Sequence, residues 1–257
     1  MLIDSHCHLN RLDLKKYEGD MDRLIEATHT AGIECVLNVC VDLESAHEVV
    51  ATAQKYPNVY ASIGLHPSDV KGRILQKSDL LQRVNQPKVI AVGETGLDYH
   101  YNTEQLEEMR ASFCLHIEVA RETKKPLIIH TRNARADTLR IMREEKADEI
   151  GGVMHCFTEN LEMAKAAIDL GFYISFSGII TFKNAEELQE VARQVPLENI
   201  LIETDAPYLT PIPYRGKSNE PQYVRYVAEK IAELKNMSFA QVAEVTTQNF
   251  KNLFCLS

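Results

Sequence analysis

Short apolar runs alternate along the chain with longer stretches in which apolar residues recur every three or four positions. The runs are continuous and rich in β-branched residues, as is typical of parallel strands that are covered on both faces. They predict eight strands, at residues 2–5, 35–41, 59–63, 88–92, 127–129, 152–154, 172–176 and 200–202. The stretches between them predict helices at residues 21–31, 43–54, 80–84, 103–123, 136–146, 161–170 and 185–194.

Residues that start and stop helices support this division. Glycines at positions 32 and 171 follow predicted helices, where a left-handed residue often ends a helix. Asn184 precedes Glu187 in the spacing of an N-cap and its N3 partner. Near the end of the chain, helical spacing from 224 to 234 predicts another helix, and Ser238 with Gln241 forms a capping box that opens a further one.

The alternation of strands and helices sets the expected fold. Eight such units in 257 residues predict a (β/α)8 TIM barrel that forms one domain over residues 1–257, with extra C-terminal helices. An open doubly wound sheet is the alternative. No run approaches the roughly 18 apolar residues that a membrane helix needs, and no basic segment followed by an apolar one marks a secretory signal. We therefore expect a cytoplasmic protein that does not contact membranes.

Polar residues end several of the predicted strands, and in a TIM barrel these ends form the mouth that holds the active site. His6 and His8 would face the same side, because strand side chains alternate. The strand-end residues are His6, His8, His66, Glu94, His130, His155 and Asp205.

Each of these residues has an ordinary alternative role. His66, which precedes Pro67, can equally cap a turn, and His130 or His155 taken alone can be a core histidine. Without His66, however, the set is four imidazoles and two carboxylates, which would be costly to bury together without metal. The set therefore predicts two divalent metal ions that share one bridging carboxylate.

The other histidines and the cysteines suggest no second site. The histidines at positions 29, 47, 100 and 116 fall in predicted helices or loops, where we expect them to be solvated. Six cysteines, at positions 7, 35, 40, 114, 156 and 255, show no C-x-x-C pair. We expect them to be small buried hydrophobic residues rather than disulfides or metal ligands. Alternation would also turn Cys7 away from the face that His6 and His8 share.

The formal net charge of −9 argues against a broad basic groove for nucleic acid. It allows a local positive site, because bound divalent metals would add charge at the place where a phosphate must sit.

Eight short motifs stand in order along the chain: IDSHCH at 3–8, GLHP at 64–67, GETGLDY at 93–99, HTR at 130–132, HCF at 155–157, ETDAPYL at 203–209, RGKSNEP at 215–221 and TQN at 247–249. In this set and order the sequence resembles the TatD-type metal-dependent deoxyribonucleases over nearly its whole length. The resemblance implies a TIM barrel of the amidohydrolase-like superfamily and a dinuclear metal site. It also implies hydrolysis of phosphodiester bonds in DNA, often as an exonuclease that works from the 3′ end.

The resemblance also implies roles for individual residues. One metal would be bound by His6, His8 and Asp205, the second by His130 and His155, and Glu94 would bridge them. His66 would lie close to the metals and touch the scissile phosphate, and Glu203 would support the ligands from behind. The chain departs from the family at Asn133, where many relatives carry Asp, and at His100, where an aromatic residue is common.

The expected mechanism is attack on the phosphate by a metal-activated hydroxide, with Asp205 orienting the water or accepting its proton. We expect Arg132, Arg215 and Lys217 to hold phosphate oxygens, although each can instead be a solvated surface charge. Tyr99 and Tyr208 can stack on unpaired bases, which would favour single-stranded ends of DNA, or they can simply pack the loops.

Other functions use the same barrel. An aminoacyl-tRNA ester hydrolase or a small-molecule amidohydrolase would need the same dinuclear site, although many amidohydrolases carry a modified lysine where Glu94 stands. A non-catalytic binding protein would be expected to lack some ligands, and none is missing here. The donor set suits Zn, Mn, Co or Ni, and weakly bound Mg also fits the expectation. DNA is the expected substrate, and no obligate protein partner is implied.

Overall fold

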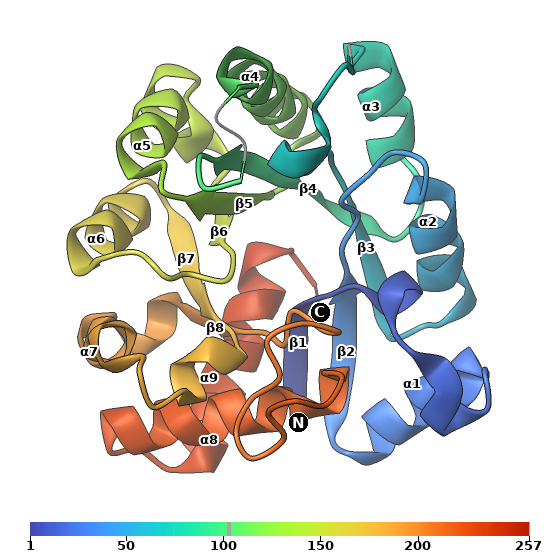
Figure 1. Cartoon of the computed structure of the whole chain (residues 1–257), viewed down its shortest axis with the longest axis vertical. Coiled ribbons are helices and arrows are strands. Elements are labelled where there is room, and N and C mark those ends of the chain that lie inside the picture. The colour runs from blue at the N-terminus through green and yellow to red at the C-terminus, as the bar shows by residue number, and fades with distance from the viewer. Residues whose placement is uncertain (74, 102–103, 257) are drawn as a thin grey trace.

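Eight parallel strands lie side by side in chain order in a computed structural model of the protein, which describes residues 1–73, 75–101 and 104–256 (Figure 1). The strands are β1 (Leu2–Cys7), β2 (Ile33–Asn38), β3 (Val59–Ile63), β4 (Val89–Asp98), β5 (Leu127–Arg132), β6 (Gly152–Met154), β7 (Phe172–Phe176) and β8 (Ile200–Ile202).

The sheet closes on itself where β1 meets the end of β8. The amide of His8 donates to the carbonyl of Ala206 at 2.8 Å, and the amide of Asp205 donates to the carbonyl of His6 at 2.9 Å. The buried carboxylate of Asp4 accepts from the amide of Thr204 at 2.8 Å and from its hydroxyl at 2.5 Å. These bonds confirm the predicted TIM barrel and exclude the open doubly wound sheet.

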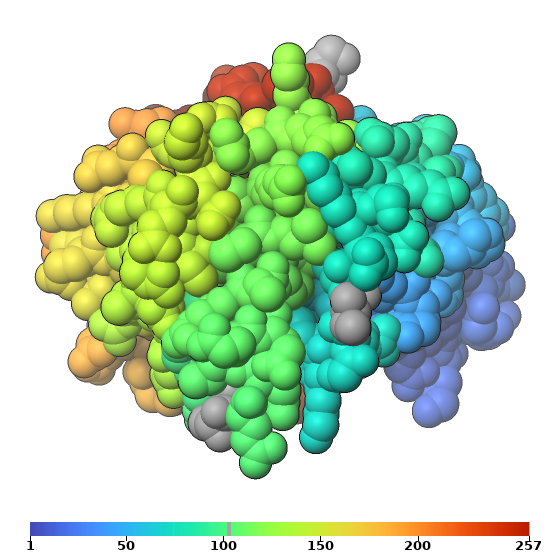
Figure 2. Space-filling model, turned by 90° about the horizontal axis from the view of Figure 1, so that it is seen from above, coloured from blue at the N-terminus to red at the C-terminus, as the bar shows by residue number. Residues whose placement is uncertain are grey.

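Helices surround the strands (Figure 1). They are α1 (Met21–Thr30), α2 (Ala46–Lys55), α3 (Lys77–Val84), α4 (Leu106–Thr123), α5 (Arg135–Glu144), α6 (Leu161–Asp169), α7 (Glu186–Gln194), α8 (Val224–Lys235) and α9 (Phe239–Leu253). Short 3-10 helices are η1 (Leu9–Arg11), η2 (Leu14–Tyr17), η3 (Pro67–Asp69), η4 (Ala147–Glu149), η5 (Gly178–Thr181), η6 (Leu197–Asn199) and η7 (Pro221–Tyr223). Figure 2 shows the segments following one another around the outer surface in chain order. Within the described ranges, none of the helices has the length and apolar character needed to cross a membrane.

The apolar core has two layers. Residues from alternate positions of the strands, such as Ile3, Leu37 and Ile128, fill the inside of the barrel together with Phe250 of α9 and Phe254, which follows it. The other face of each strand packs against the surrounding helices in a larger cluster. Because the inner layer is apolar, polar side chains can gather inside the barrel only beyond it, at the carboxyl ends of the strands.

Most predicted helices are present, with shifted ends. The capping box of Ser238 and Gln241 is confirmed, and glycines 32 and 171 have the expected positive φ of 89° and 80°. The predicted Asn184 cap is wrong, because α7 starts one residue later, after Ala185, and has no side-chain cap. Helix α2 starts at Ala46 rather than at residue 43, because Asp42 accepts from the amide of Ser45 at 2.7 Å and holds a turn. Thr103, the predicted start of α4, lies outside the described residues.

Irregular pairing in β1 and β4 turns two polar residues into the barrel. Ile3 faces the inside, so simple alternation would turn His6, three residues later, to the outside. The register between β1 and β2 shifts between Asp4 and Cys7, and His6 therefore faces inward. The register of β4 against β5 likewise shifts between Val92 and Thr95, where Glu94 enters the barrel. Such bulges re-aim side chains next to functional sites.

Candidate metal centre

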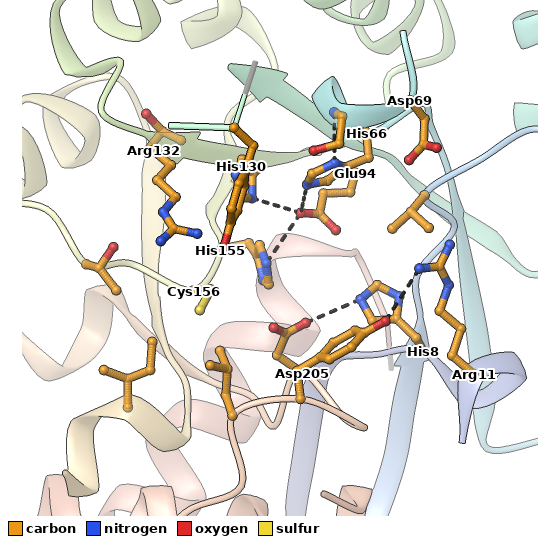
Figure 3. Close-up of a pocket in the computed structure, with 18 residues that line it drawn as sticks. His8, Arg11, His66, Asp69, Glu94, His130, Arg132, His155, Cys156 and Asp205 are labelled. Carbon is orange, nitrogen blue, oxygen red and sulfur yellow. Dashed lines mark hydrogen bonds and ion pairs between the residues drawn. The ribbon is translucent and has the colours of Figure 1, made fainter. Parts of the chain in front are cut away.

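Glu94 lies at the centre of a group of imidazoles at the barrel mouth (Figure 3). Its Oε2 atom is 3.4 Å from Nε2 of His6. Its Oε1 atom is 3.2 Å from Nδ1 of His130 and 3.4 Å from Nε2 of His155. The two carboxylate oxygens therefore face two different sets of histidines. The sequence had placed Glu94 at the end of its strand, whereas β4 continues to Asp98 and Glu94 lies within it.

Asp205 completes the set that Oε2 of Glu94 faces. Its Oδ1 atom is 3.3 Å from Nε2 of His8 and 3.8 Å from Nε2 of His6. The rings of His6 and His8 are 5.0 Å apart, so the two histidines share one side of β1 as predicted. Ligand atoms of His6, His8 and Asp205 lie within 4.8 Å of one another, and so do those of His66, Glu94 and His130.

Polar partners on the far sides of three rings set which nitrogen faces the cluster. Nδ1 of His8 donates to a main-chain carbonyl at 2.9 Å. Nδ1 of His155 lies 2.8 Å from Oε1 of Glu203, with which it forms an ion pair. Nε2 of His130 donates to Oδ2 of Asp98 at 3.1 Å. Metal binding requires the neutral form of each ring, which carries one proton. With that proton on the far nitrogen, the opposite nitrogen would have a free lone pair that points into the cluster. Partners of this kind orient metal-binding histidines.

His66 has the opposite arrangement. Its Nδ1 atom accepts the amide proton of Ser68 at 3.1 Å, which caps η3. The proton of the neutral ring is therefore on Nε2, which lies 3.4 Å from Oε1 of Glu94. The turn-capping alternative for His66 is confirmed, and the same ring still enters the site. There it presents a hydrogen-bond donor rather than the lone pair that a metal requires.

His6 supplies the clearest test of whether these residues fit a metal. Its side chain is 1% exposed, and neither ring nitrogen has a hydrogen-bond partner among the described residues. Each unsatisfied buried polar group costs about 1–3 kcal/mol. Its ring also stacks on that of His155 at 3.5 Å, an arrangement that disfavours two imidazolium charges. A metal ion beside Nε2 would satisfy one nitrogen, so the nitrogen and oxygen donors here fit a transition metal.

The buried charges of the site act strongly on one another. Burial opposes ionisation of Glu94, but the facing rings of His155 and His66 hold the pKa of its carboxyl well below the usual range. Burial likewise opposes a charge on His155, but Glu203 and Glu94 raise the pKa of this ring to about 10. Burial lowers the pKa of His66 to about 4. The site thus holds ionised carboxylates that need positive charge nearby.

An open cavity of about 740 Å³ lies above the cluster. Arg132, two residues after His130, lines this cavity, and no described residue forms an ion pair or hydrogen bond with its guanidinium. Tyr208 also lines the cavity and is exposed. Two residues without a predicted role join them at the rim, Arg11 and Tyr101.

Three predicted substrate contacts lie elsewhere. Arg215 lies over the ring of Phe182 at 3.9 Å, and the Nζ atom of Lys217 is 5.4 Å from the ring of Tyr214. Neither cation lines the cavity. The hydroxyl of Tyr99 donates to Asp137 at 2.7 Å, so this residue packs its loop. Arg215 thus packs on Phe182, which follows η5, and Lys217 lies near Tyr214 of its own loop.

Two other predictions from the sequence need correction. His116 was expected to be solvated, but it is fully buried in α4, while the other three histidines of that group are exposed. Cys255 was expected to be buried and is exposed, because it follows the end of α9. Cys114 and Cys156 are half-buried, and all six cysteines are free. The thiol of Cys7 points to the carbonyl of Leu37, away from the cluster, as alternation predicts.

Asp98 is a site residue that the sequence reasoning missed. It belongs to the GETGLDY motif, and alternation along β4 from Glu94 places residue 98 on the same face. The sequence therefore contained enough information to predict Asp98 as a site residue. By contrast, Arg11 ends the short 3-10 helix η1 and Tyr101 is on a loop, and nothing in the sequence indicated that their side chains would turn to the cavity.

Comparison with known proteins identifies the family. The profile described as "TatD related DNase" matches residues 3–255. The chain belongs to the TatD family. Among its relatives are the metal-dependent hydrolase YcfH of Escherichia coli K12, 47% identical over 98% of this chain and 95% of the relative, and YabD of Bacillus subtilis 168, 41% identical over 99% of both. The solved structure of the TatD homologue YjjV from Escherichia coli K12 covers 100% of this TatD-family chain and 98% of its own, with 27% identity and a TM-score of 0.92. The family and the enzyme class predicted from the sequence are confirmed.

Proposed function

We propose that this metal-dependent hydrolase of the TatD family cleaves phosphodiester bonds in DNA, as a 3′–5′ exonuclease that acts on single-stranded ends. The observation that carries the proposal is the position of Glu94. Its two carboxylate oxygens face separate histidine sets beneath an open cavity, and Arg132 lines that cavity without an ion-pair partner in the described chain. A bridged pair of divalent ions beside a free guanidinium suits a phosphodiester anion.

The ligands divide into two sets. His6, His8 and Asp205 would hold one ion, and His130 and His155 the other, with Glu94 between them. Bound divalent metals supply Lewis acidity and lower the pKa of water, which provides a nucleophile near neutral pH. Glu203 and Asp98 keep the rings of His155 and His130 in the tautomer that leaves a lone pair facing the cluster.

The remaining groups act on the substrate. The proton on Nε2 of His66 can be donated to a non-bridging oxygen of the scissile phosphate, because Ser68 occupies the other ring nitrogen. Arg132 can pair with a phosphate oxygen at the rim. Asp205, held by His8 at 3.3 Å, orients the attacking water or accepts its proton.

A 5′-labelled single-stranded oligonucleotide tests the proposal, with Mg²⁺, Mn²⁺, Co²⁺ or Zn²⁺ added to the metal-free protein. We expect stepwise shortening from the 3′ end with at least one of the transition metals, whose preferred ligands include imidazole. Glu94→Ala should abolish the shortening and reduce the bound metal. Full activity of Glu94→Ala would remove the proposed bridge.

The other substrates of the same site are separate arms of this assay. An aminoacyl-tRNA and a panel of small esters and amides are incubated under the same conditions. Rapid metal-dependent hydrolysis of one of these compounds, with the oligonucleotide left intact, would refute the nuclease proposal and leave the hydrolase class in place.

A further inference from the structure

Among the described residues, which include all ten tyrosines of the chain, only two tyrosines are exposed, and both lie at the cavity mouth. The chain has ten tyrosines, and the eight others are buried or half-buried. Tyr101 is 68% exposed and Tyr208 is 47% exposed, and both line the cavity above the metal cluster. Leaving a large aromatic ring in water forgoes the gain from burying it, so two such rings at one mouth suggest that they have a partner there.

Each exposed tyrosine stands beside an arginine. The guanidinium of Arg132 lies 4.6 Å from the ring centre of Tyr101. A guanidinium nitrogen of Arg11 lies 3.5 Å from the hydroxyl of Tyr208, and another lies 3.2 Å from Oδ2 of Asp42. Asp42 thus holds one edge of the Arg11 guanidinium. An arginine has five N–H donors, so further donors remain for an anion at the cavity.

The two pairs lie on opposite sides of the barrel. Tyr101 follows β4 and Arg132 ends β5, whereas Tyr208 follows β8 and Arg11 follows β1. In an eight-stranded barrel of this order, β4 is diametrically opposite β8, and β5 is opposite β1. Figure 3 shows Arg132 and Arg11 on the two sides of the mouth, with Glu94, His155 and Asp205 between them.

A strand of nucleic acid offers groups that match this arrangement. An aromatic ring binds an unpaired base by stacking, and an arginine binds a phosphate. We infer that a single strand crosses the mouth and is held on both sides of the scissile bond, with one unpaired base on Tyr101, one on Tyr208, and neighbouring phosphates on Arg132 and Arg11. This inference rests on the proposed function and specifies its substrate as a strand with at least two unpaired bases, rather than a mononucleotide or a small ester.

The test measures binding by the metal-loaded protein rather than turnover. The ligands are short single-stranded oligonucleotides whose terminal linkage is a methylenephosphonate, which keeps its negative charge and is not hydrolysed. In two further ligands, the base on one or the other side of that linkage is replaced by an abasic residue. Fluorescence anisotropy gives the Kd of each ligand for the wild type and for Tyr101→Leu and Tyr208→Leu.

We expect each substitution to weaken binding of the complete ligand roughly five- to tenfold, the low end of measured stacking effects. With the ligand that lacks the matching base, the same substitution should have little effect, because the contact is already lost. Tyr101 and Tyr208 should couple to bases on different sides of the linkage. Tyr101→Phe should bind like the wild type, since stacking needs only the ring. Arg225→Gln, on the outer helix α8, is the matched surface control and should bind like the wild type.

Other outcomes separate this inference from the proposed function. If the protein shortens an unmodified oligonucleotide but both leucine variants bind like the wild type, the inference is wrong and the nuclease function stands. The same conclusion follows if the loss of affinity persists with the abasic ligands, since the tyrosines would then act through the fold. If the oligonucleotide is neither shortened nor bound, the proposed function fails and the inference fails with it.

Discussion

His116 connects α4 to the segment that carries His66. Its Nδ1 atom donates to the carbonyl of Ser112 at 2.7 Å, and its Nε2 atom accepts the amide proton of Leu65 at 3.0 Å. Burial lowers the pKa of the ring from 6.5 to about 4. A second proton would place a donor against the Leu65 amide, which is also a donor. We therefore predict that acid weakens this connection and that replacing His116 removes part of the acid sensitivity of the fold.

The sign of the effect follows from the two pKa values. The pKa in the folded state is below that of the unfolded state, so the unfolded chain takes up the proton first as the pH falls. The contribution to stability is complete above about pH 6.5, decreases between about 6.5 and about 4, and levels off below that window. The difference between a pKa of 6.5 and one of about 4 corresponds to about 3 kcal/mol in the free energy of unfolding, of which about 2 kcal/mol is lost by about pH 5.

The assay compares the wild type with His116→Gln by urea unfolding at about pH 7.5 and about pH 5. Circular dichroism follows the transition, since the chain has no tryptophan, and EDTA removes any contribution from bound metal. Glutamine can accept from Leu65 and does not titrate. The free energy of unfolding of the wild type, relative to that of the variant, should therefore fall by about 2 kcal/mol from about pH 7.5 to about pH 5.

His47→Gln is the matched control, because His47 is exposed on α2. Its stability relative to the wild type should not change between the two pH values. A difference between the wild type and His116→Gln that is also independent of pH would refute the assignment of His116 as a buried neutral acceptor.

Three further predictions concern the site and the closure of the barrel. Glu203→Gln should lower metal affinity about 10- to 100-fold in a chelator competition, because it removes the charged acceptor that orients His155. His66→Ala should keep the wild-type metal content while kcat on the oligonucleotide falls; loss of one metal ion per chain would make His66 a ligand instead. In urea unfolding, Asp4→Asn should cost less than about 1 kcal/mol and Asp4→Ala about 3 kcal/mol, because only alanine leaves the buried Thr204 groups without a partner.

The sequence predicted the barrel well because its strands are uniform. Each apolar run is short and is buried on both faces, and a period of two or of three to four residues separates strand from helix. The helix ends were less accurate, as at α7, where Asn184 had the right spacing for a cap and the helix starts without one. Tertiary contacts can determine where a helix starts and override a local capping signal, because most of the stability of a helix comes from its packed face.

The site was predictable where the backbone is regular. His130 lies within β5 and His155 directly follows β6, and the alternation of these strands brings both into the barrel. The structure places both beside Glu94. For His6 and Glu94, alternation from the core gives the wrong face, and local register shifts correct it. The family motifs identified these two residues, whereas the two-residue alternation of strand side chains could not. Neither the motifs nor the alternation could place loop side chains such as Tyr101, because a loop has no regular repeat that relates sequence position to side-chain direction.

The charges that line the cavity connect metal binding to substrate recognition. Three carboxylates, Asp69, Glu94 and Asp205, and two guanidiniums, Arg11 and Arg132, line it, which leaves a net charge of −1 when the imidazoles are neutral. Without metal, a phosphate would meet carboxylates at the bottom of the mouth in a chain whose formal net charge is −9. Two divalent ions at the proposed site would reverse the sign of the local charge. At the site that we propose, the arginines alone would not attract the strand, and the ions that supply the chemistry would also supply the field that brings the phosphate to them.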